Sequence, residues 1–205
     1  MKGLNQEEEK IFRRLSTPQK VQDYLDKMPI NHEKNGETLM SPRYVIEKRK
    51  AHCIEGALFA ATALWFHGRK PLLLDLKSIG PPYDFDHVVA LFKENGYWGA
   101  ISKTNHAVLR YRDPIYKSVR ELALSFFHEY FIDSGKKTLR SYSKPFDLSK
   151  LGDSWITSEK NLWNIEKKLD GSPHTPFFPF RSIKNLRKAS AFEVKVFKPI
   201  EWPKK

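Results

Sequence analysis

The single cysteine of the chain, Cys53, is the residue best suited to act as a nucleophile. It opens the stretch with the strongest helical periodicity, 53–66, so we expect its thiol at the N-terminus of a helix. Unpaired N–H groups and the helix dipole stabilise a thiolate there, and the basic residues at 48–50 act in the same direction. The alternative is an inert thiol packed in the core, which is common for a free cysteine.

His87 is the residue that could accept the proton of this thiol. It follows an acidic loop that contains Asp84 and Asp86, at the start of an apolar run that predicts a strand. An imidazole in that place could form the ion pair that makes a cysteine nucleophilic. The alternative is a surface histidine paired with Asp86. The other histidines lack this setting, and His52, next to Cys53, is expected to point elsewhere on the helix.

A third residue that orients His87 should lie across a β-hairpin. The pair Asn95-Gly96 is typical of a tight hairpin turn. With a four-residue loop, Ser102 lies opposite His87, whereas with the tight turn the partner is Thr104. Asn105 lies close by and could serve as an amide orienter. The candidate catalytic set is therefore Cys53 and His87 with Ser102 and Asn105.

A helix packed on an antiparallel sheet would bring these residues together. A mostly apolar run at 71–76 predicts a buried strand after the helix 53–66, and the hairpin 87–101 follows it. Helix, strand and hairpin in that order predict an α+β fold rather than a doubly wound parallel sheet. The apolar positions of 53–66 form one stripe, as in an amphipathic helix. A further helix is predicted at 119–131.

The length of 205 residues predicts a single domain, 1–205. We expect its core at about 41–131, after an N-terminal helical extension at 1–40. The segment 141–205 is rich in proline and aromatic residues and is predicted to wrap around the core in an extended form. Two elements are predicted within it, a helix at 158–169 and a late strand at 192–197.

Three segments between about 41 and 131 resemble the transglutaminase-like superfamily, in particular its uncharacterised bacterial branch. In that superfamily a cysteine opens a central helix, a histidine opens a strand, and an aspartate lies on the next strand after a tryptophan. The matching segments are Ala51-His-Cys-Ile-Glu-Gly-Ala57, Asp86-His-Val-Val89 and Tyr97-Trp-Gly-Ala-Ile-Ser-Lys-Thr-Asn105.

The resemblance implies a papain/transglutaminase-like core, with Cys53 as the nucleophile and His87 as the base. The aspartate position of the family falls on Ser102, which is a departure from the family pattern. The implied reaction is attack on a glutamine or peptide carbonyl to form a thioester, which an amine or water then resolves without a cofactor. A catalytically inactive binding or scaffold module with a basic surface is the alternative that Ser102 favours.

The composition limits the other classes of function. One cysteine excludes an intrachain disulfide, and no Cys-x-x-Cys or His-Glu-x-x-His spacing occurs, so no metal is expected. The formal net charge of +12 would allow non-specific binding of polyanions, but no nucleic-acid-binding motif accompanies it. The first residues lack the apolar run of a secretory signal, and the longest apolar stretch is too short to span a bilayer. We therefore expect a cytoplasmic protein with a protein or peptide substrate and no membrane partner.

Overall fold

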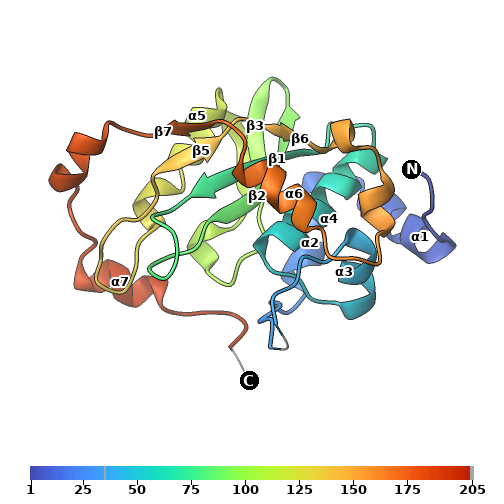
Figure 1. Cartoon of the computed structure of the whole chain (residues 1–205), viewed down its shortest axis with the longest axis horizontal. Helices are drawn as coiled ribbons and strands as arrows, with labels where there is room; N and C mark the ends of the chain where they lie inside the picture. The colour runs from blue at the N-terminus through green and yellow to red at the C-terminus, as the bar shows by residue number, and fades with distance from the viewer. Residues whose placement is uncertain (35, 204–205) are drawn as a thin grey trace.

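The computed structural model describes residues 1–34 and 36–203, which form helices packed against a sheet (Figure 1). The helices are α1 (Gln6–Arg14), α2 (Pro18–Asp26), α3 (Pro42–Lys48), α4 (Cys53–Phe66), α5 (Val119–Leu124), α6 (Trp163–Asp170) and α7 (Ala191–Phe197). The strands are β1 (Leu72–Lys77), β2 (His87–Glu94), β3 (Tyr97–Ile101), β4 (Arg112–Tyr116), β5 (Ser141–Ser143), β6 (Phe146–Asp147) and β7 (His174–Pro176). Short 3-10 turns connect several of them.

The described strands form one sheet in the order β4-β3-β2-β1-β5-β7, with β6 also paired to β1. Every pairing is antiparallel. Helix α4 packs against this sheet, mainly on β2. The predicted α+β class and the helix on an antiparallel sheet are therefore confirmed.

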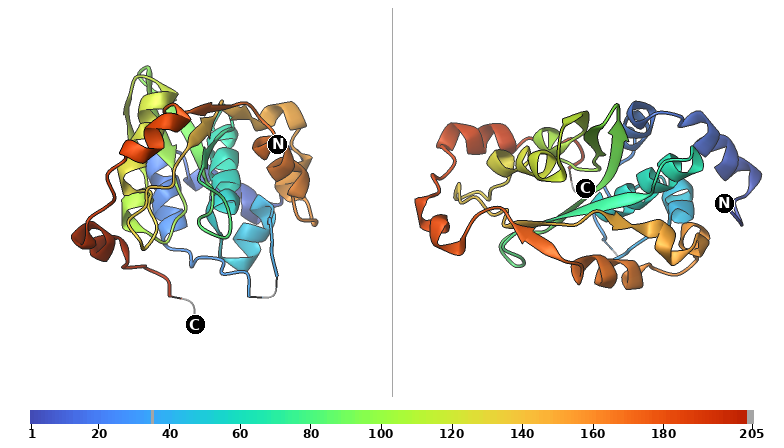
Figure 2. Two further views of the ribbon diagram at one scale, coloured as in Figure 1. Left: turned by 60° about the vertical axis from the view of Figure 1, so that its left-hand side comes forward. Right: turned by 90° about the horizontal axis from the view of Figure 1, so that it is seen from above.

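Helix α4 lies in the middle of the molecule. It contacts β2 on one side and α1, α2 and α3 on the others, as the blue and cyan ribbons around it show (Figure 2). Every residue from Ile54 to Leu64 is buried. The prediction of a single apolar stripe was wrong, because a helix enclosed on all sides is apolar around its whole circumference. The start and end of the helix lie where the periodicity predicts them, at Cys53 and Phe66.

The first turn of α4 holds the segment that follows β3. Gly56 has no side chain, and a Cβ there would lie 2.3 Å from the Cβ of Lys103. The buried ammonium group of Lys103 donates to the carbonyl oxygens of Leu25 at 2.9 Å and Met28 at 2.5 Å, at the end of α2. This close approach ties the residues after β3 to both helices.

The hairpin between β2 and β3 has the tight turn. Glu94 pairs with Tyr97, so Asn95 and Gly96 alone form the turn, both with positive φ (49° and 87°). Such conformations suit asparagine and glycine, which explains the pair at this position. The register that the four-residue loop would impose is therefore excluded.

Alternate residues of β2 face two different cores. Val88, Ala90 and Phe92 pack in the core around α4. Val89 and Leu91 pack in a second core with α5 on the other face of the sheet. The strand therefore reads as a continuous apolar run because both of its faces are covered.

The C-terminal segment differs most from its prediction. Residues 192–197 lie in helix α7, where a strand was predicted, because Ser190 and Glu193 form a capping box that starts a helix. The segment also adds β5, β6 and β7 to the sheet. The helix predicted at 158–169 begins later, at Trp163.

The helix predicted at 119–131 is also shorter than expected. Helix α5 ends at Leu124, and a 3-10 turn at Phe127–Glu129 follows it. Among the described helices, none combines the length and the apolar character that crossing a membrane requires.

Candidate active site

Cys53 is the first residue of α4, and its side chain is partly exposed. The preceding residue, His52, is the N-cap, with an extended backbone at φ −94° and ψ −173°. The thiol therefore lies beside the unpaired N–H groups of the first helical turn, as the sequence predicts.

A buried carboxylate fixes the geometry of this turn. Glu55 is wholly buried and accepts hydrogen bonds from the backbone N–H of His52 at 3.0 Å and of Met40 at 2.9 Å. It also accepts from the hydroxyl of Thr38 at 2.8 Å and from the amide of Asn31 at 3.1 Å. Because its oxygens are occupied in this way, Glu55 anchors the loop before α3 to the start of α4 and is not free to act as an acid.

His52 lies against the thiol, so the prediction that it points elsewhere was wrong. Its Nε2 lies 2.9 Å from the carbonyl oxygen of Thr38, which can only accept, so Nε2 carries a proton. The imidazole also lies near enough to Cys53 to lower the pKa of the thiol. The helical spacing missed this contact because an N-cap residue has a non-helical backbone, which turns its side chain away from the helical direction.

His87 begins β2 and lies near enough to Cys53 to lower the pKa of the thiol. Its Nε2 lies 2.8 Å from the hydroxyl oxygen of Ser102. That hydroxyl donates to the carbonyl oxygen of Leu109 at 2.7 Å, so it must accept from Nε2–H of His87. The tautomer that results leaves Nδ1 of His87 for the thiol.

Ser102 reaches His87 diagonally. Continuing the hairpin register past Ile101 places Ser102 opposite Val89, two residues along the same face of the strand from His87. The side-chain amide of Gln22 holds the backbone of Ser102 in both directions, at 2.9 Å each. The tight turn therefore occurs, yet the hydrogen-bond partner of His87 is Ser102 and not Thr104.

The structure does not bring Asn105 to the imidazole, which corrects its prediction as an orienter. Its side chain donates to the carbonyl oxygen of Trp202 at 2.9 Å and accepts from the N–H of Trp202 at 2.8 Å. The chain leaves the sheet after Ser102, and the C-terminal segment supplies partners that no local pattern predicts. Asn105 therefore anchors that segment.

Two imidazoles make the thiol acidic. Burial raises the pKa of Cys53, but hydrogen bonds from His52 and His87 and their charges outweigh burial and lower it to about 5. For His52, burial lowers the pKa, and the hydrogen bond and charge of Cys53 outweigh this effect and raise it to about 9. At neutral pH the pair is therefore a thiolate and an imidazolium.

Cys53 and His52 line a cleft of about 680 Å³. The cleft lies between the start of α4, the loop before α3, the loop before β2 and helix α6. Its volume is in the range of small-molecule and substrate sites. Most of its charged lining residues are acidic: Glu33, Glu37, Asp75, Asp86, Glu166 and Asp170.

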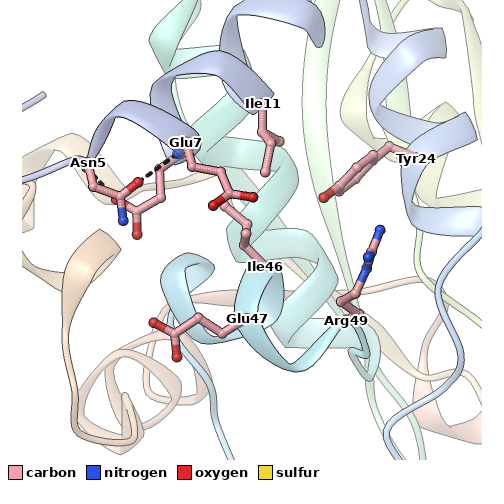
Figure 3. Close-up of a pocket in the computed structure, with 8 residues that line it drawn as sticks. Asn5, Glu7, Ile11, Tyr24, Ile46, Glu47 and Arg49 are labelled. Carbon is pink, nitrogen blue, oxygen red and sulfur yellow. Dashed lines mark hydrogen bonds between the residues drawn. The ribbon is translucent and has the colours of Figure 1, made fainter.

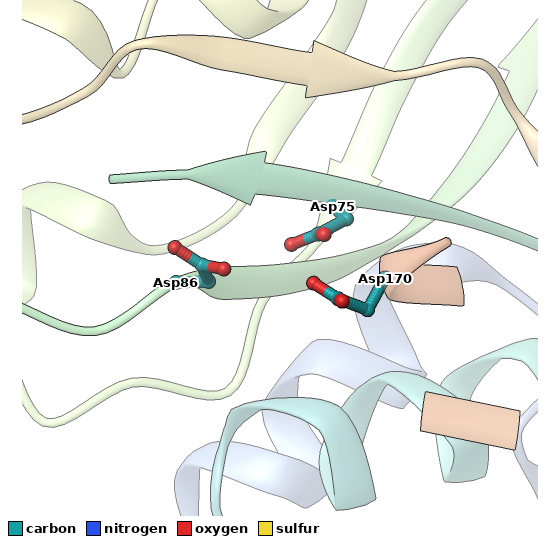
Figure 4. A group of neighbouring side chains, drawn as sticks. All are labelled: Asp75, Asp86 and Asp170. Atoms are coloured by element: carbon teal, nitrogen blue, oxygen red, sulfur yellow. The ribbon is translucent and has the colours of Figure 1, made fainter. Parts of the chain in front are cut away.

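Three of these carboxylates lie close enough to share a cation. One oxygen from each of Asp75, Asp86 and Asp170 lies within 4.8 Å of the others, and Figure 4 shows the side chains converging. Asp75 comes from β1, Asp86 immediately precedes β2, and Asp170 ends α6. The sequence analysis missed this group, because its members lie far apart along the chain and follow no spacing motif.

A second hollow, of about 300 Å³, lies between α1, α2 and α3 (Figure 3). Its lining includes Asn5, whose side chain caps α1, together with Tyr24 and Arg49. No cysteine or histidine is among its lining residues. Of these two sites, the cleft lined by Cys53 and His52 is therefore the one with side chains suited to nucleophilic chemistry.

Neither a scan against protein-family models nor a search of curated proteins gives a match to this chain. Its chemistry has to be argued from the site. A thiolate at a helix start, an imidazole with a defined tautomer and an adjoining cleft are the parts that covalent catalysis on a carbonyl carbon requires.

Proposed function

We propose that the chain is a thiol-dependent enzyme of the transglutaminase-like superfamily that acts on amide bonds, as a cysteine peptidase or amidase or by acyl transfer. The observation that supports this proposal most is the contact of Cys53 with two imidazoles, one of which, His87, is oriented by Ser102. The substrate would be a protein or peptide, and Cys53, His87 and Ser102 would work without a cofactor.

The proposed reaction has two halves. The thiolate of Cys53 attacks the amide carbonyl carbon, and the negative charge moves to the carbonyl oxygen. The backbone N–H of Cys53, at the first position of α4, could donate to that oxygen. As the C–N bond breaks, the proton that the thiol lost to the imidazoles beside it passes to the leaving amine, and an acyl thioester remains.

In the second half, water or an amine attacks the thioester carbonyl while His87 takes a proton from the attacking group. The C–S bond breaks and the thiolate returns. With water the product is a carboxylic acid, and with an amine it is a new amide. Both outcomes use the same residues, so the identity of the acceptor decides between hydrolysis and transfer.

Ser102 would do the positioning work that the family gives to an aspartate. Because its hydroxyl hydrogen is directed to Leu109, it offers His87 an acceptor lone pair, as a carboxylate would. A neutral acceptor forms a weaker hydrogen bond than a charged one. We therefore expect orientation of His87 to be retained and stabilisation of its positive charge to be reduced.

The proposal is tested by the rate of iodoacetamide alkylation of Cys53 as a function of pH. A thiolate–imidazolium pair predicts a rate midpoint near pH 5, whereas an ordinary thiol has its midpoint near pH ~8.5. The alkylation rate measures the reactivity of the Cys53 thiolate. Turnover is measured separately, as release of an amine or formation of a new amide from a peptide substrate. A midpoint above pH 8 would overturn the proposal.

The second candidate is a catalytically inactive module of the same superfamily that binds a partner through its basic surface. Ser102 in place of the family aspartate and the net charge of +12 favour it. In that case Cys53 would still become alkylated at low pH, but no peptide or glutamine amide would be converted. Retention on heparin that is lost by ~0.2 M salt would indicate non-specific binding of polyanions only.

A further inference from the structure

Asp75 has a buried oxygen without a hydrogen-bond partner. The residue is 3% exposed, and its Oδ2 lies 3.0 Å from Nε2 of His174. Its Oδ1 has no partner among the described residues. An unsatisfied carboxylate oxygen inside a protein costs free energy. Because Asp75 lines the cleft beside Cys53, a ligand in the cleft could supply the missing partner.

Two further carboxylates converge on the same place (Figure 4). Asp86 accepts from the N–H of Ser78 at 2.7 Å, and Asp170 pairs with Lys77 at 2.5 Å. Each contact engages one carboxylate oxygen, Oδ1 in both residues. Together with Asp75, the group therefore concentrates more negative charge than its protein partners balance.

The rest of the cleft lining is also rich in acidic residues. Three glutamates also line it, and Lys167 is the one lysine or arginine among its lining residues. This composition contrasts with the net charge of +12 for the whole chain. Two aromatic side chains border the cleft and are open to solvent, Phe85 at 72% and Trp163 at 40% exposure. The cleft therefore offers apolar and aromatic surface next to carboxylates.

We propose that Asp75, Asp86 and Asp170 form a subsite for an organic cation, a primary ammonium or guanidinium group at the end of an aliphatic stem. Below, these three residues are called the carboxylate pole. The cation would be a side chain of the amide substrate, so the inference rests on the proposed function and adds a substrate class to it. The aliphatic stem would pack on the aromatic side chains of Phe85 and Trp163, and the charged end would donate a hydrogen bond to the unpaired Oδ1 of Asp75.

The same surroundings favour an organic cation over a metal ion. Calcium takes six to eight oxygen ligands and magnesium a near-ideal octahedron. Here the neighbours of the three carboxylates include the ammonium group of Lys77, which cannot ligate a metal, and His174, whose Nδ1 donates to the carbonyl oxygen of Ser172 at 2.6 Å. Aromatic and apolar lining, in contrast, suits the stem and the face of an alkylammonium or guanidinium group.

The test uses two probes with the same four-carbon stem, Nα-acetyl-lysinamide and Nα-acetyl-norleucinamide, of which only the first carries a terminal ammonium group. Binding to the full chain is followed by NMR titration and by protection of Cys53 from iodoacetamide. We expect saturable binding and protection with the lysine probe and at least tenfold weaker effects with the neutral one. Equal effects of the two probes, or none from either, would overturn the inference.

Substitutions of the three carboxylates also test whether they bind the cation. Asp75→Asn is expected to weaken binding of the lysine probe about tenfold or more. If that buried variant does not fold, Asp170→Asn, at an exposed position, should weaken it severalfold. Asp23→Asn on the exposed side of α2 is the matched control, with the same loss of charge and no expected effect.

Two further measurements separate this inference from the proposed function. In Cys53→Ala, binding of the lysine probe should persist, because the subsite does not use the thiol. Low-pH alkylation of the wild type without discrimination between the probes would leave the enzyme proposal standing and defeat the subsite. Tight binding of CaCl₂ or MgCl₂ alone, abolished by Asp75→Asn, would identify a metal site and overturn the organic cation.

Discussion

The thiol of Cys53 and the carboxylate pole line the same cleft but differ in how their negative charge is stabilised. At the thiol of Cys53, two imidazoles donate hydrogen bonds, and the pKa falls to about 5 although burial raises it. At the carboxylate pole, burial and the charge of Asp86 raise the pKa of Asp75 to about 6, and His174 offsets only part of this rise. Burial raises the pKa of both groups, so the donors and charges that face each one decide the direction of the shift.

The two groups therefore differ in how completely the unliganded protein stabilises their negative charge. The protein itself stabilises the thiolate through the imidazoles beside it. The carboxylates are incompletely balanced, so a bound cation would lower the free energy of the site. A reactive anion and a binding anion can therefore be distinguished by their hydrogen-bond partners in the unliganded protein.

The largest expected effect comes from removing His87, the imidazole that Ser102 orients. In His87→Ala we expect the midpoint of Cys53 alkylation to rise by two or more pH units. The rate at pH 6 should fall by at most about tenfold, because the loss of thiolate is largely offset by its greater intrinsic nucleophilicity. The measurement is the pH–rate profile with iodoacetamide. His128→Ala, at an exposed histidine, is the control and should leave the profile unchanged.

At the carboxylate pole the pKa of Asp75 is raised rather than lowered, so its ionisation should change the stability of the fold. Because the pKa of Asp75 is raised from 3.8 to about 6 by folding, the folded state binds more protons than the unfolded state in this window. The contribution of Asp75 to stability is therefore greatest below pH 4 and is lost as the pH rises through 6.

Asp75→Asn keeps an oxygen for His174 and removes the buried charge. We expect it to be more stable than the wild type at pH 7, by on the order of 1–3 kcal/mol, and to lose this advantage near pH 4. Urea unfolding at the two pH values measures the difference. Asp86, Asp170, Lys77 and His174 all face this carboxylate, so a smaller gain at pH 7 would mean that they balance its charge better than the raised pKa indicates.

Ser102→Ala tests whether the hydroxyl positions His87. Without it, Nε2 of His87 loses its acceptor and the carbonyl oxygen of Leu109 loses its donor. We expect severalfold slower alkylation with a midpoint that moves toward higher pH, and a loss of about 1–3 kcal/mol in the free energy of unfolding. Ser102→Thr, which keeps a hydroxyl, should recover most of the alkylation profile. If both variants lose stability but keep the wild-type profile, Ser102 has a structural role only.

The smallest effect is expected for the second imidazole. In His52→Ala the thiolate keeps His87, so the midpoint should rise by less than in His87→Ala and the rate at pH 6 should change only a few fold. The profile is measured with iodoacetamide as before. A larger shift than that of His87→Ala would make His52 the main partner of the thiolate, and the proposed roles of the two histidines would be exchanged.

Local patterns were sufficient for the parts of the site that lie on single elements. The bounds of α4, the start of β2 at His87 and the turn at Asn95-Gly96 follow from apolar periodicity and turn chemistry, which act over a few residues. The same patterns failed where distant segments compete. Helix α4 is apolar on all sides because three other helices and a strand cover it, and α7 is a helix because a capping box outweighs the alternation of its apolar residues.

The sequence by itself determined that a cysteine starts a helix and that a histidine starts a strand of an α+β sheet. Tertiary structure decided which side chains surround them: His52 at the thiol, Ser102 diagonal to His87, and Asn105 on the C-terminal segment. It also brought Asp75 and Asp86 together with Asp170 across the cleft. The reason is physical: helix and strand signals come from neighbours in the chain, whereas hydrogen-bond partners and buried charge depend on segments that meet only after folding.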